Sequence, residues 1–234
     1  MSLEARMLLS ILKLGTKQMD IREISKESNI PLNIVRKDLK KLANENLIHI
    51  EDGRVEISTE QMLKLVILAI KGGVDVERAC KAIGWQAFED LVISILDSNG
   101  FATRKHFRFQ NQNKRFEIDV LGLKEPFIFL IECKHWKQSW QRSATIKIVE
   151  KQIQRTKALI KSFQEQRARL KVNRWRDALL LPMVLTLSVT PLKTYKHVPV
   201  IPIFYFQNFI NNEMNAHIDK FKFYPIRDIN QTNT

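Results

Sequence analysis

The chain has 234 residues, of which 44% are hydrophobic and 27% charged, as in a globular protein of one large or two small domains. Its longest apolar run, Leu65 to Ile70, is far too short to span a membrane, so no membrane partner is expected. Two cysteines are too few for a disulfide framework, and the N-terminus lacks a secretory signal. We therefore expect a reduced, cytoplasmic protein.

The formal net charge of +13 is distributed unevenly along the chain. Residues 1–58 hold 10 basic and 9 acidic side chains, whereas residues 101–176 hold 19 basic and 6 acidic ones. Such a basic surface favours a polyanionic partner, with DNA as the first candidate. Plain solubility or an anionic membrane surface is the alternative.

The first 58 residues predict a compact helical unit that ends in a hairpin. Apolar spacing and end signals give a helix over 3–14, a helix over 21–28, a helix from Pro31 to about Glu45 and a hairpin over 47–58. Gly15 is placed to end the first helix, Asp20 to cap the second, and Gly53 to form the hairpin turn.

This order of elements resembles the winged-helix form of the helix-turn-helix, whose third helix commonly enters the DNA major groove. The resemblance implies DNA contacts from Asn33, Arg36, Lys37 and Lys40. Because the local charge is nearly neutral, a role in protein docking or dimerisation is the alternative. Residues 59–84, with a helix over 59–71 and a short helix over 74–83, are expected to form a helical connector.

The next predicted helix, residues 85–98, carries Glu89 on the same face as its apolar stripe of Trp85, Val92 and Leu96. A glutamate within such a stripe needs a partner. A salt bridge at the edge of the helix would supply one, and a functional site is the other possibility.

The stretch from Lys114 to Trp136 predicts two strands joined by a short turn. The first carries Asp119, and the second carries Glu132 and Lys134, while nearly all neighbouring residues are apolar on both faces. Charges in a covered strand cost free energy unless they are paired or bind a metal. Two interpretations therefore remain, a metal site and a buried ion-pair network.

The remaining pattern predicts one further strand before this pair and several elements after it. These are a strand over 101–109, a long basic helix over 143–170, apolar strands over 179–187 and 198–206, and a closing helix over 209–220. The spacing of Ile146, Val149, Ile153, Ile160 and Phe163 predicts the buried face of the long helix, with Gln152 at its border.

From residue 85 to about 210, this order resembles the PD-(D/E)XK nuclease superfamily, and within it Mrr-like and archaeal junction-resolvase-like members. The matching residues are Glu89, Asp119 in EIDVLG, the acid-x-lysine element Glu132-Cys133-Lys134, and Gln152, for which Gln154 competes. Ile118 stands where the family motif has a proline.

The resemblance implies an α/β fold in which a restriction-endonuclease-like αβββαβ core with a mixed central sheet fills residues 85–234. The winged-helix domain (1–58) and the connector (59–84) would precede it. It also implies a catalytic set of Glu89, Asp119, Glu132, Lys134 and Gln152. Mg²⁺, for which Mn²⁺ may substitute, would be held by Asp119, Glu132, the Cys133 carbonyl and Glu89.

We accordingly expect a metal-dependent DNA endonuclease that binds the phosphate backbone through its basic helix and the loop before it. The expected contacts are Lys137, Arg142, Lys147, Lys151 and Arg155. A homodimer is expected because cutting both strands normally takes two active sites. The alternatives are an inactive DNA-binding regulator on a nuclease scaffold and a docking module. The sequence does not choose between junction resolution, restriction and repair as the pathway.

Overall fold

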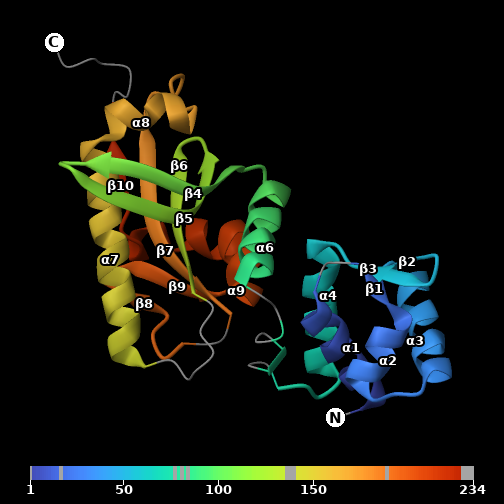
Figure 1. The fold of residues 1–234 in the computed structure, drawn as a ribbon. Coiled ribbons are helices and arrows are strands. Elements are labelled where there is room, and N and C mark those ends of the chain that lie inside the picture. Colours follow the sequence, from blue (N-terminus) through green and yellow to red (C-terminus); the bar gives the residue numbers. More distant parts are fainter. Residues whose placement is uncertain are drawn as a thin grey trace. The chain divides into compact units, whose positions relative to one another are not determined.

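The computed structural model describes residues 2–15, 18–75, 78–79, 82, 85–134, 141–187 and 190–227 (Figure 1). The chain divides into two compact units, Met1–Ser94 and Ile95–Thr234. The division falls within helix α6 (Trp85–Ser98). The expected boundaries after residues 58 and 84 stay predictions.

The N-terminal unit combines helices with a small antiparallel sheet. Its helices are α1 (Leu3–Leu14), α2 (Ile21–Ser28), α3 (Leu32–Asn44) and α4 (Thr59–Lys71), and its strands are β1 (Met19–Asp20), β2 (His49–Glu51) and β3 (Arg54–Glu56). The strands lie in the order β1-β3-β2, and α1 packs against both α2 and α4. The helices predicted over 3–14, 21–28 and 59–71 are confirmed, whereas β1 was not predicted.

Local signals explain where these helices begin and end. The Asp20 carboxylate accepts a hydrogen bond of 2.7 Å from the Arg22 N–H, and Glu23 in turn accepts one from the Asp20 N–H. This reciprocal arrangement satisfies amide groups that the first helical turn leaves without partners. Gly15 ends α1 with a φ of 86°, a conformation that costs glycine least.

The second unit is built on one mixed sheet. Its strands are β4 (Ala102–Asn111), β5 (Lys114–Lys124), β6 (Phe127–Lys134), β7 (Ala178–Thr186), β8 (Thr194–Tyr195), β9 (Val198–Pro202) and β10 (Tyr224–Ile226). They lie in the order β4-β5-β6-β7-β9-β8, and β10 pairs with the beginning of β7. Because β6, β7 and β9 are parallel and the other pairs antiparallel, the expected α/β class with a mixed sheet is confirmed.

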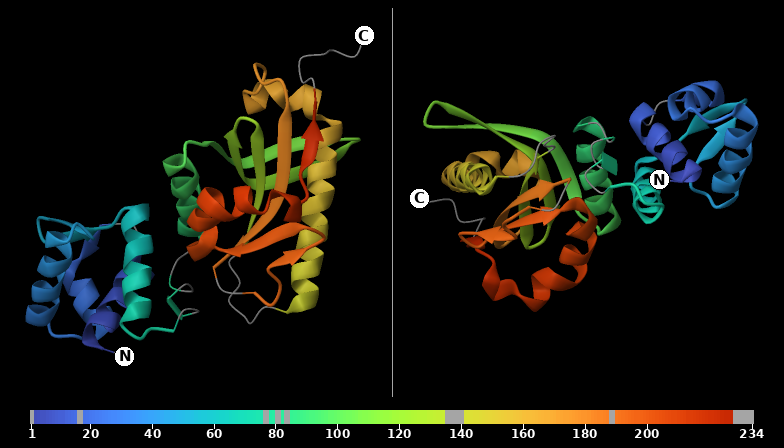
Figure 2. Two further views of the ribbon diagram at one scale, coloured as in Figure 1. Left: turned by 180° about the vertical axis from the view of Figure 1, so that it is seen from behind. Right: turned by 90° about the horizontal axis from the view of Figure 1, so that it is seen from below.

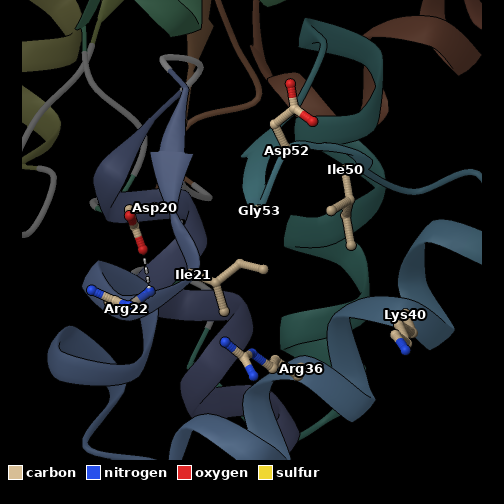
Figure 3. A pocket seen from close by; sticks show the side chains of 8 residues that line it. All are labelled: Asp20, Ile21, Arg22, Arg36, Lys40, Ile50, Asp52 and Gly53. Carbon is tan, nitrogen blue, oxygen red and sulfur yellow. Dashed lines mark hydrogen bonds between the residues drawn. The ribbon is translucent and has the colours of Figure 1, made fainter.

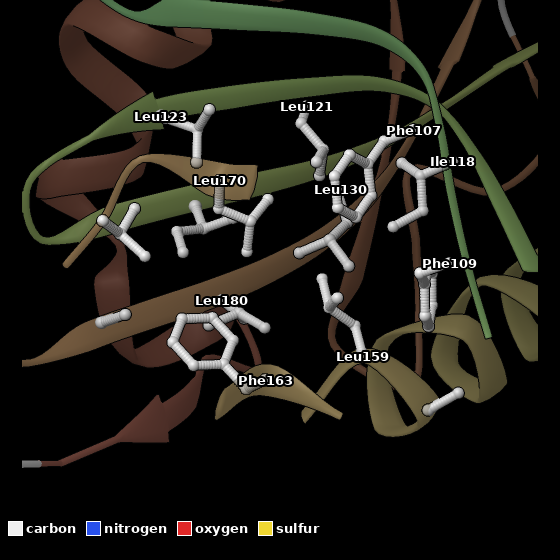
Figure 4. Close-up of a cluster of buried hydrophobic side chains, with 14 residues drawn as sticks. Phe107, Phe109, Ile118, Leu121, Leu123, Leu130, Leu159, Phe163, Leu170 and Leu180 are labelled. Atoms are coloured by element: carbon white, nitrogen blue, oxygen red, sulfur yellow. The ribbon is translucent and has the colours of Figure 1, made fainter. Parts of the chain in front are cut away.

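Helices cover both faces of this sheet. Helices α7 (Arg142–Lys161) and α8 (Phe163–Leu170) follow β6, and α9 (Ile203–Asn208) follows β9. Figure 2 shows α7 along one face of the sheet and α9 on the other. An apolar core between the sheet and α7–α8 includes Phe107, Phe109, Ile118, Leu121, Leu130, Leu159, Phe163 and Leu180 (Figure 4). Within the described residues, no helix is long and apolar enough to cross a membrane.

The single helix predicted over 143–170 is wrong in two respects. It is interrupted at Ser162, whose hydroxyl donates to the Ala158 carbonyl and so competes with the helical backbone bonds. The buried face of α7 is also rotated from the predicted one, since Ile146, Ile153 and Ile160 are only partly buried. Its buried residues are Thr145, Ile148, Val149, Gln152, Thr156, Ala158 and Leu159. Gln152 therefore lies inside this face and not at its border.

The strand predicted over 198–206 is too long. Strand β9 ends at Pro202, which lacks the N–H that a continuing ladder needs and begins α9 with a φ of −63°. The closing helix predicted over 209–220 is instead a π-helical turn (Phe209–Glu213), the short α10 (Met214–Ala216) and a 3₁₀ turn (Ile218–Lys220).

A close contact between α6 and β5 gives a first test of the fold. A Cβ on Gly122 would lie 2.9 Å from Cδ2 of Leu96, which is closer than real carbon atoms pack. Gly122→Ala should therefore reduce the free energy of unfolding by about 1–3 kcal/mol in urea denaturation, the usual cost of overpacking. In a Leu96→Ala background the same change should cost less than half as much. Equal costs in both backgrounds would show that the Leu96 contact is not the cause.

Candidate active site

The site lies where β5 and β6 separate. The ladder between these strands runs as far as the pair Val120 and Ile131. One residue further, the Asp119 carboxylate accepts a hydrogen bond of 2.8 Å from the Cys133 N–H. A side chain thus replaces the backbone acceptor of the neighbouring strand. This bond holds Asp119 against the stretch of β6 that carries Glu132 and Lys134.

Glu132 is a buried carboxylate held by two cations. Its side chain is 5% exposed, and the Lys134 Nζ lies 2.6 Å from its Oε1. The Arg155 guanidinium, from α7, donates to its Oε2. A buried charge is tolerated only when it is paired in this way. Two of the three expected charges of the site, Glu132 and Lys134, are therefore in direct contact.

Gln152 connects α7 to the same strand. It is fully buried, and its Nε2 donates a hydrogen bond of 2.7 Å to the Leu130 carbonyl. Its Oε1 accepts a longer bond of 3.3 Å from Arg155. The amide thereby fixes α7 against β6 and helps to aim the guanidinium at Glu132. Gln154, the competing candidate, is exposed.

Arg155 is the residue whose position sequence reasoning missed. It was expected on the DNA-facing surface, but its side chain is only 24% exposed and points at Glu132. A signal was present, because residues three apart lie on the same side of a helix, and Arg155 follows the buried Gln152 by three.

The electrostatics of Asp119 reflect this crowding of charges. Burial is the largest effect, and together with the Glu132 charge it raises the pKa of Asp119 from 3.8 to about 6. The Cys133 N–H, Lys134 and Arg155 oppose the rise by favouring the ionised form. Asp119, Glu132, Lys134 and Arg155 therefore act on one another as a single cluster, which we call the acid cluster.

The donor atoms of the acid cluster fit a hard divalent cation. Asp119 and Glu132 supply carboxylate oxygens from adjacent strands, the Cys133 carbonyl follows Glu132 in the sequence, and Mg²⁺ prefers such oxygen ligands. A cation there would also offset the Glu132 charge, which after burial is the second cause of the raised Asp119 pKa. No group of three or more His, Cys, Asp or Glu residues that could hold a metal is found in the described part of the chain. The fit thus rests on two carboxylates and a carbonyl.

Glu89 is buried, with 1% of the residue exposed, as its place in the apolar stripe of α6 suggested. It belongs to the first unit, so its share in the site stays a prediction. Glu117, two residues before Asp119, has partners of its own. Arg108 lies 2.7 Å and His106 3.3 Å from its carboxylate, and the Arg108 hydrogen bond lowers the Glu117 pKa.

Apart from Arg155, the expected DNA contacts that the structure describes lie on exposed helix surfaces. Arg142, Lys147 and Lys151 are exposed on α7, whereas Lys137 is outside the described residues. In the N-terminal unit, Asn33, Arg36, Lys37 and Lys40 are all exposed on α3. A groove of about 550 Å³ is lined by Asp20, Ile21, Arg22, Arg36, Lys40, Ile50, Asp52 and Gly53 (Figure 3). It brings Arg36 and Lys40 together with Arg22 and the hairpin turn.

Three solved structures share weak similarity with the chain. A protein of unknown function, AF1548, has 17% identity and a TM-score of 0.31, with 53% of each chain covered. Protein VC1899 from Vibrio cholerae has 12% identity and a TM-score of 0.36, with 93% of this chain and 52% of that one covered. This chain thus spans about half the length of both proteins. The small subunit of a heterodimeric restriction endonuclease has 14% identity and a TM-score of 0.31, with 70% and 82% covered.

These TM-scores are too low to support a conclusion about the fold or the function. No curated protein matches the sequence. A family profile is more informative, since the nuclease-related domain (NERD) matches residues 84–206. The match includes the acid cluster, Gln152, and the strands β5 and β6 and helix α7 that carry them, and it covers slightly more than half of the 234 residues. The chain therefore belongs to the nuclease-related domain family.

Proposed function

We propose that the chain is a metal-dependent DNA endonuclease of the PD-(D/E)XK type. The observation that carries the proposal is the arrangement of two carboxylates and a lysine where β5 and β6 separate. Asp119 is held there by the Cys133 N–H, and Lys134 lies 2.6 Å from Glu132. Membership of the nuclease-related domain family supports the same reaction class.

The residues of the acid cluster have distinct roles in this proposal. Asp119, Glu132 and the Cys133 carbonyl would hold Mg²⁺, which would supply an activated water and neutralise charge on the scissile phosphate. Lys134 orients the attacking water and stabilises the negative charge that develops on the phosphate. Gln152 keeps α7 and β6 in register, and Glu89 is an accessory acid.

The substrate is proposed to be DNA, bound by exposed basic residues of both units. Arg142, Lys147 and Lys151 on α7 would neutralise backbone phosphates, which do not encode sequence. The N-terminal unit is proposed to be a winged helix that presents α3 to DNA, with Arg36 and Lys40 in the groove of Figure 3 as contacts. Two copies of the chain would cut the two strands.

A second candidate is a DNA-binding regulator that keeps the nuclease fold without the reaction. The observation that favours it is that both Glu132 oxygens are already paired, one with Lys134 and one with Arg155. Such a network can stabilise a buried carboxylate without any metal. This candidate would bind DNA through the α3 groove and leave it intact.

The two candidates are separated by incubating the purified protein with plasmid, flap, junction and methylated DNAs, with and without Mg²⁺ or Mn²⁺. The nuclease proposal expects metal-dependent cleavage that is abolished by Asp119→Ala. Absence of cleavage from every substrate, or cleavage unaffected by that change, would overturn it. The regulator is supported instead by salt-sensitive binding without cleavage that is lost in the double variant Arg36→Ala, Lys40→Ala.

A further inference from the structure

The acid cluster is electrically balanced before any metal enters it. Two carboxylates, Asp119 and Glu132, face two cations, Lys134 and Arg155, so the formal charges cancel when all four groups are ionised. A divalent cation added to this arrangement would bring two uncompensated positive charges to a largely buried place. Such an excess is costly unless a cation leaves the cluster or an anion joins it.

The contacts of Glu132 show which cation can leave. Each of its oxygens is in contact with one cation, so a metal ligated by Glu132 competes with Lys134 or Arg155 for the carboxylate charge. Lys134 lies two residues from Glu132 on the same strand, so the backbone itself keeps the lysine close to the carboxylate. Arg155 reaches in from α7 on a long side chain, and it also donates a hydrogen bond of 3.3 Å to Gln152, which lies outside the cluster. Arg155 is 24% exposed and Lys134 23%, so the two cations differ in how they are attached and not in their access to solvent.

We propose that Arg155 is an internal counter-cation that occupies Glu132 while no metal is bound and must be displaced when a divalent cation binds. The inference rests on the proposed function, because it concerns the regulation of the same site. It makes the metal-free protein a weak metal binder. It also couples the two ligands, since a DNA phosphate brings the negative charge that the cluster then lacks. Linkage requires that each ligand tighten the binding of the other by the same factor.

The test is the Mn²⁺ affinity of the protein without DNA, measured by isothermal titration calorimetry for the wild type and three variants. Arg155→Gln removes the competing cation and should tighten Mn²⁺ binding about tenfold, a change worth about 1.4 kcal/mol. Arg155→Lys keeps a cation at the position and should stay within about threefold of the wild type. Lys157→Gln removes the same charge from an exposed position of α7 and should leave the affinity unchanged.

Unchanged or weaker Mn²⁺ binding by Arg155→Gln would overturn the inference, as would an equal gain in Lys157→Gln. Loss of Arg155 also removes a partner of a buried carboxylate, so the variant can be less stable than the wild type. The increase in melting temperature on adding Mn²⁺ is therefore a second readout. It should be larger in Arg155→Gln than in the wild type, and a variant that folds only with Mn²⁺ supports the proposal. A variant that Mn²⁺ does not stabilise contradicts it.

The counter-cation role and the proposed function can be contradicted independently of each other. If Arg155→Gln gains Mn²⁺ affinity but no form of the protein cuts DNA, the counter-cation role of Arg155 is supported and the proposed nuclease activity is contradicted. If the wild type cuts DNA but Arg155→Gln gains no Mn²⁺ affinity, the nuclease activity is supported and the counter-cation role of Arg155 is contradicted. The predicted coupling between metal and DNA binding is checked by titrating the wild type with Ca²⁺, which limits cleavage, in the absence and in the presence of bound duplex DNA. The affinity for Ca²⁺ should be higher when DNA is bound.

Discussion

Lys134→Met should slow single-turnover cleavage of DNA in saturating Mg²⁺ by about 10²–10³-fold, the usual cost of removing one group that stabilises transition-state charge. Methionine retains most of the apolar stem but carries no charge. The Lys134 ammonium lies 2.6 Å from Glu132 and is 23% exposed, so it is partly shielded from water. In such surroundings a charge acts more strongly on a phosphate than it would in bulk solvent.

The matched control is Lys147→Met, which removes the same charge from an exposed position of α7. This variant should bind DNA more weakly and show a smaller dependence of affinity on salt, because it loses one phosphate contact. Its cleavage rate should recover when the enzyme is in excess over DNA, whereas that of Lys134→Met should not. Retention of more than about a third of the wild-type rate by Lys134→Met would exclude a catalytic role for this lysine.

Asp119→Asn should make the metal-free protein more stable at pH 8 than the wild type, by about 1–3 kcal/mol. Burial, followed by the Glu132 charge, raises the pKa of Asp119 from 3.8 to about 6 in the folded state. Between these two values the folded state holds more protons than the unfolded one, so its stability falls as the pH rises. Each unit of pKa difference corresponds to about 1.4 kcal/mol, which sets the upper limit.

The gain in Asp119→Asn should therefore be present at pH 8, shrink as the pH falls through 6 and vanish below about 4. Urea denaturation in EDTA across this range measures it. Glu117→Gln on the same strand is a control in which the expected change in stability at pH 8 has the opposite sign. Arg108 lowers the Glu117 pKa, so this variant should lose stability at pH 8 and match the wild type at low pH. A loss of stability in Asp119→Asn at pH 8 would show that the charged carboxylate stabilises the metal-free fold.

Much of the fold could be predicted because its helices carry strong local signals. The helices over 3–14, 21–28 and 59–71 have capping residues at their ends and apolar residues at helical spacing. The apolar runs of β5, β6 and β7 likewise mark a sheet covered on both faces. Short elements escaped prediction, since the two residues of β1 form a strand only by pairing with β3.

The candidate site could be predicted only in part, because sequence spacing gives the strand of a residue but not its partners. The resemblance selected Asp119, Glu132, Lys134 and Gln152. It did not predict that the Asp119 carboxylate would accept from the Cys133 N–H, which depends on where β5 and β6 separate.

The rotation of α7 was likewise set by long-range packing. The polar Gln152 is buried because the Leu130 carbonyl accepts its amide hydrogen, and this rotation carries Arg155 inward with it. A pattern of apolar residues alone places a glutamine at the border of the face. The packing of α7 against β6, two elements far apart in the sequence, places Gln152 inside the buried face instead.

The hydrogen bond from Cys133 to Asp119 has an evolutionary consequence. Because the side chain at position 119 completes the hydrogen bonding of β6, its carbonyl-type oxygen serves the fold even where no reaction takes place. Asparagine retains that oxygen and discards the charge, whereas alanine leaves a partly buried amide without an acceptor. Descendants of this chain that abandon the chemistry should therefore drift to asparagine at position 119 far more readily than to alanine or glycine.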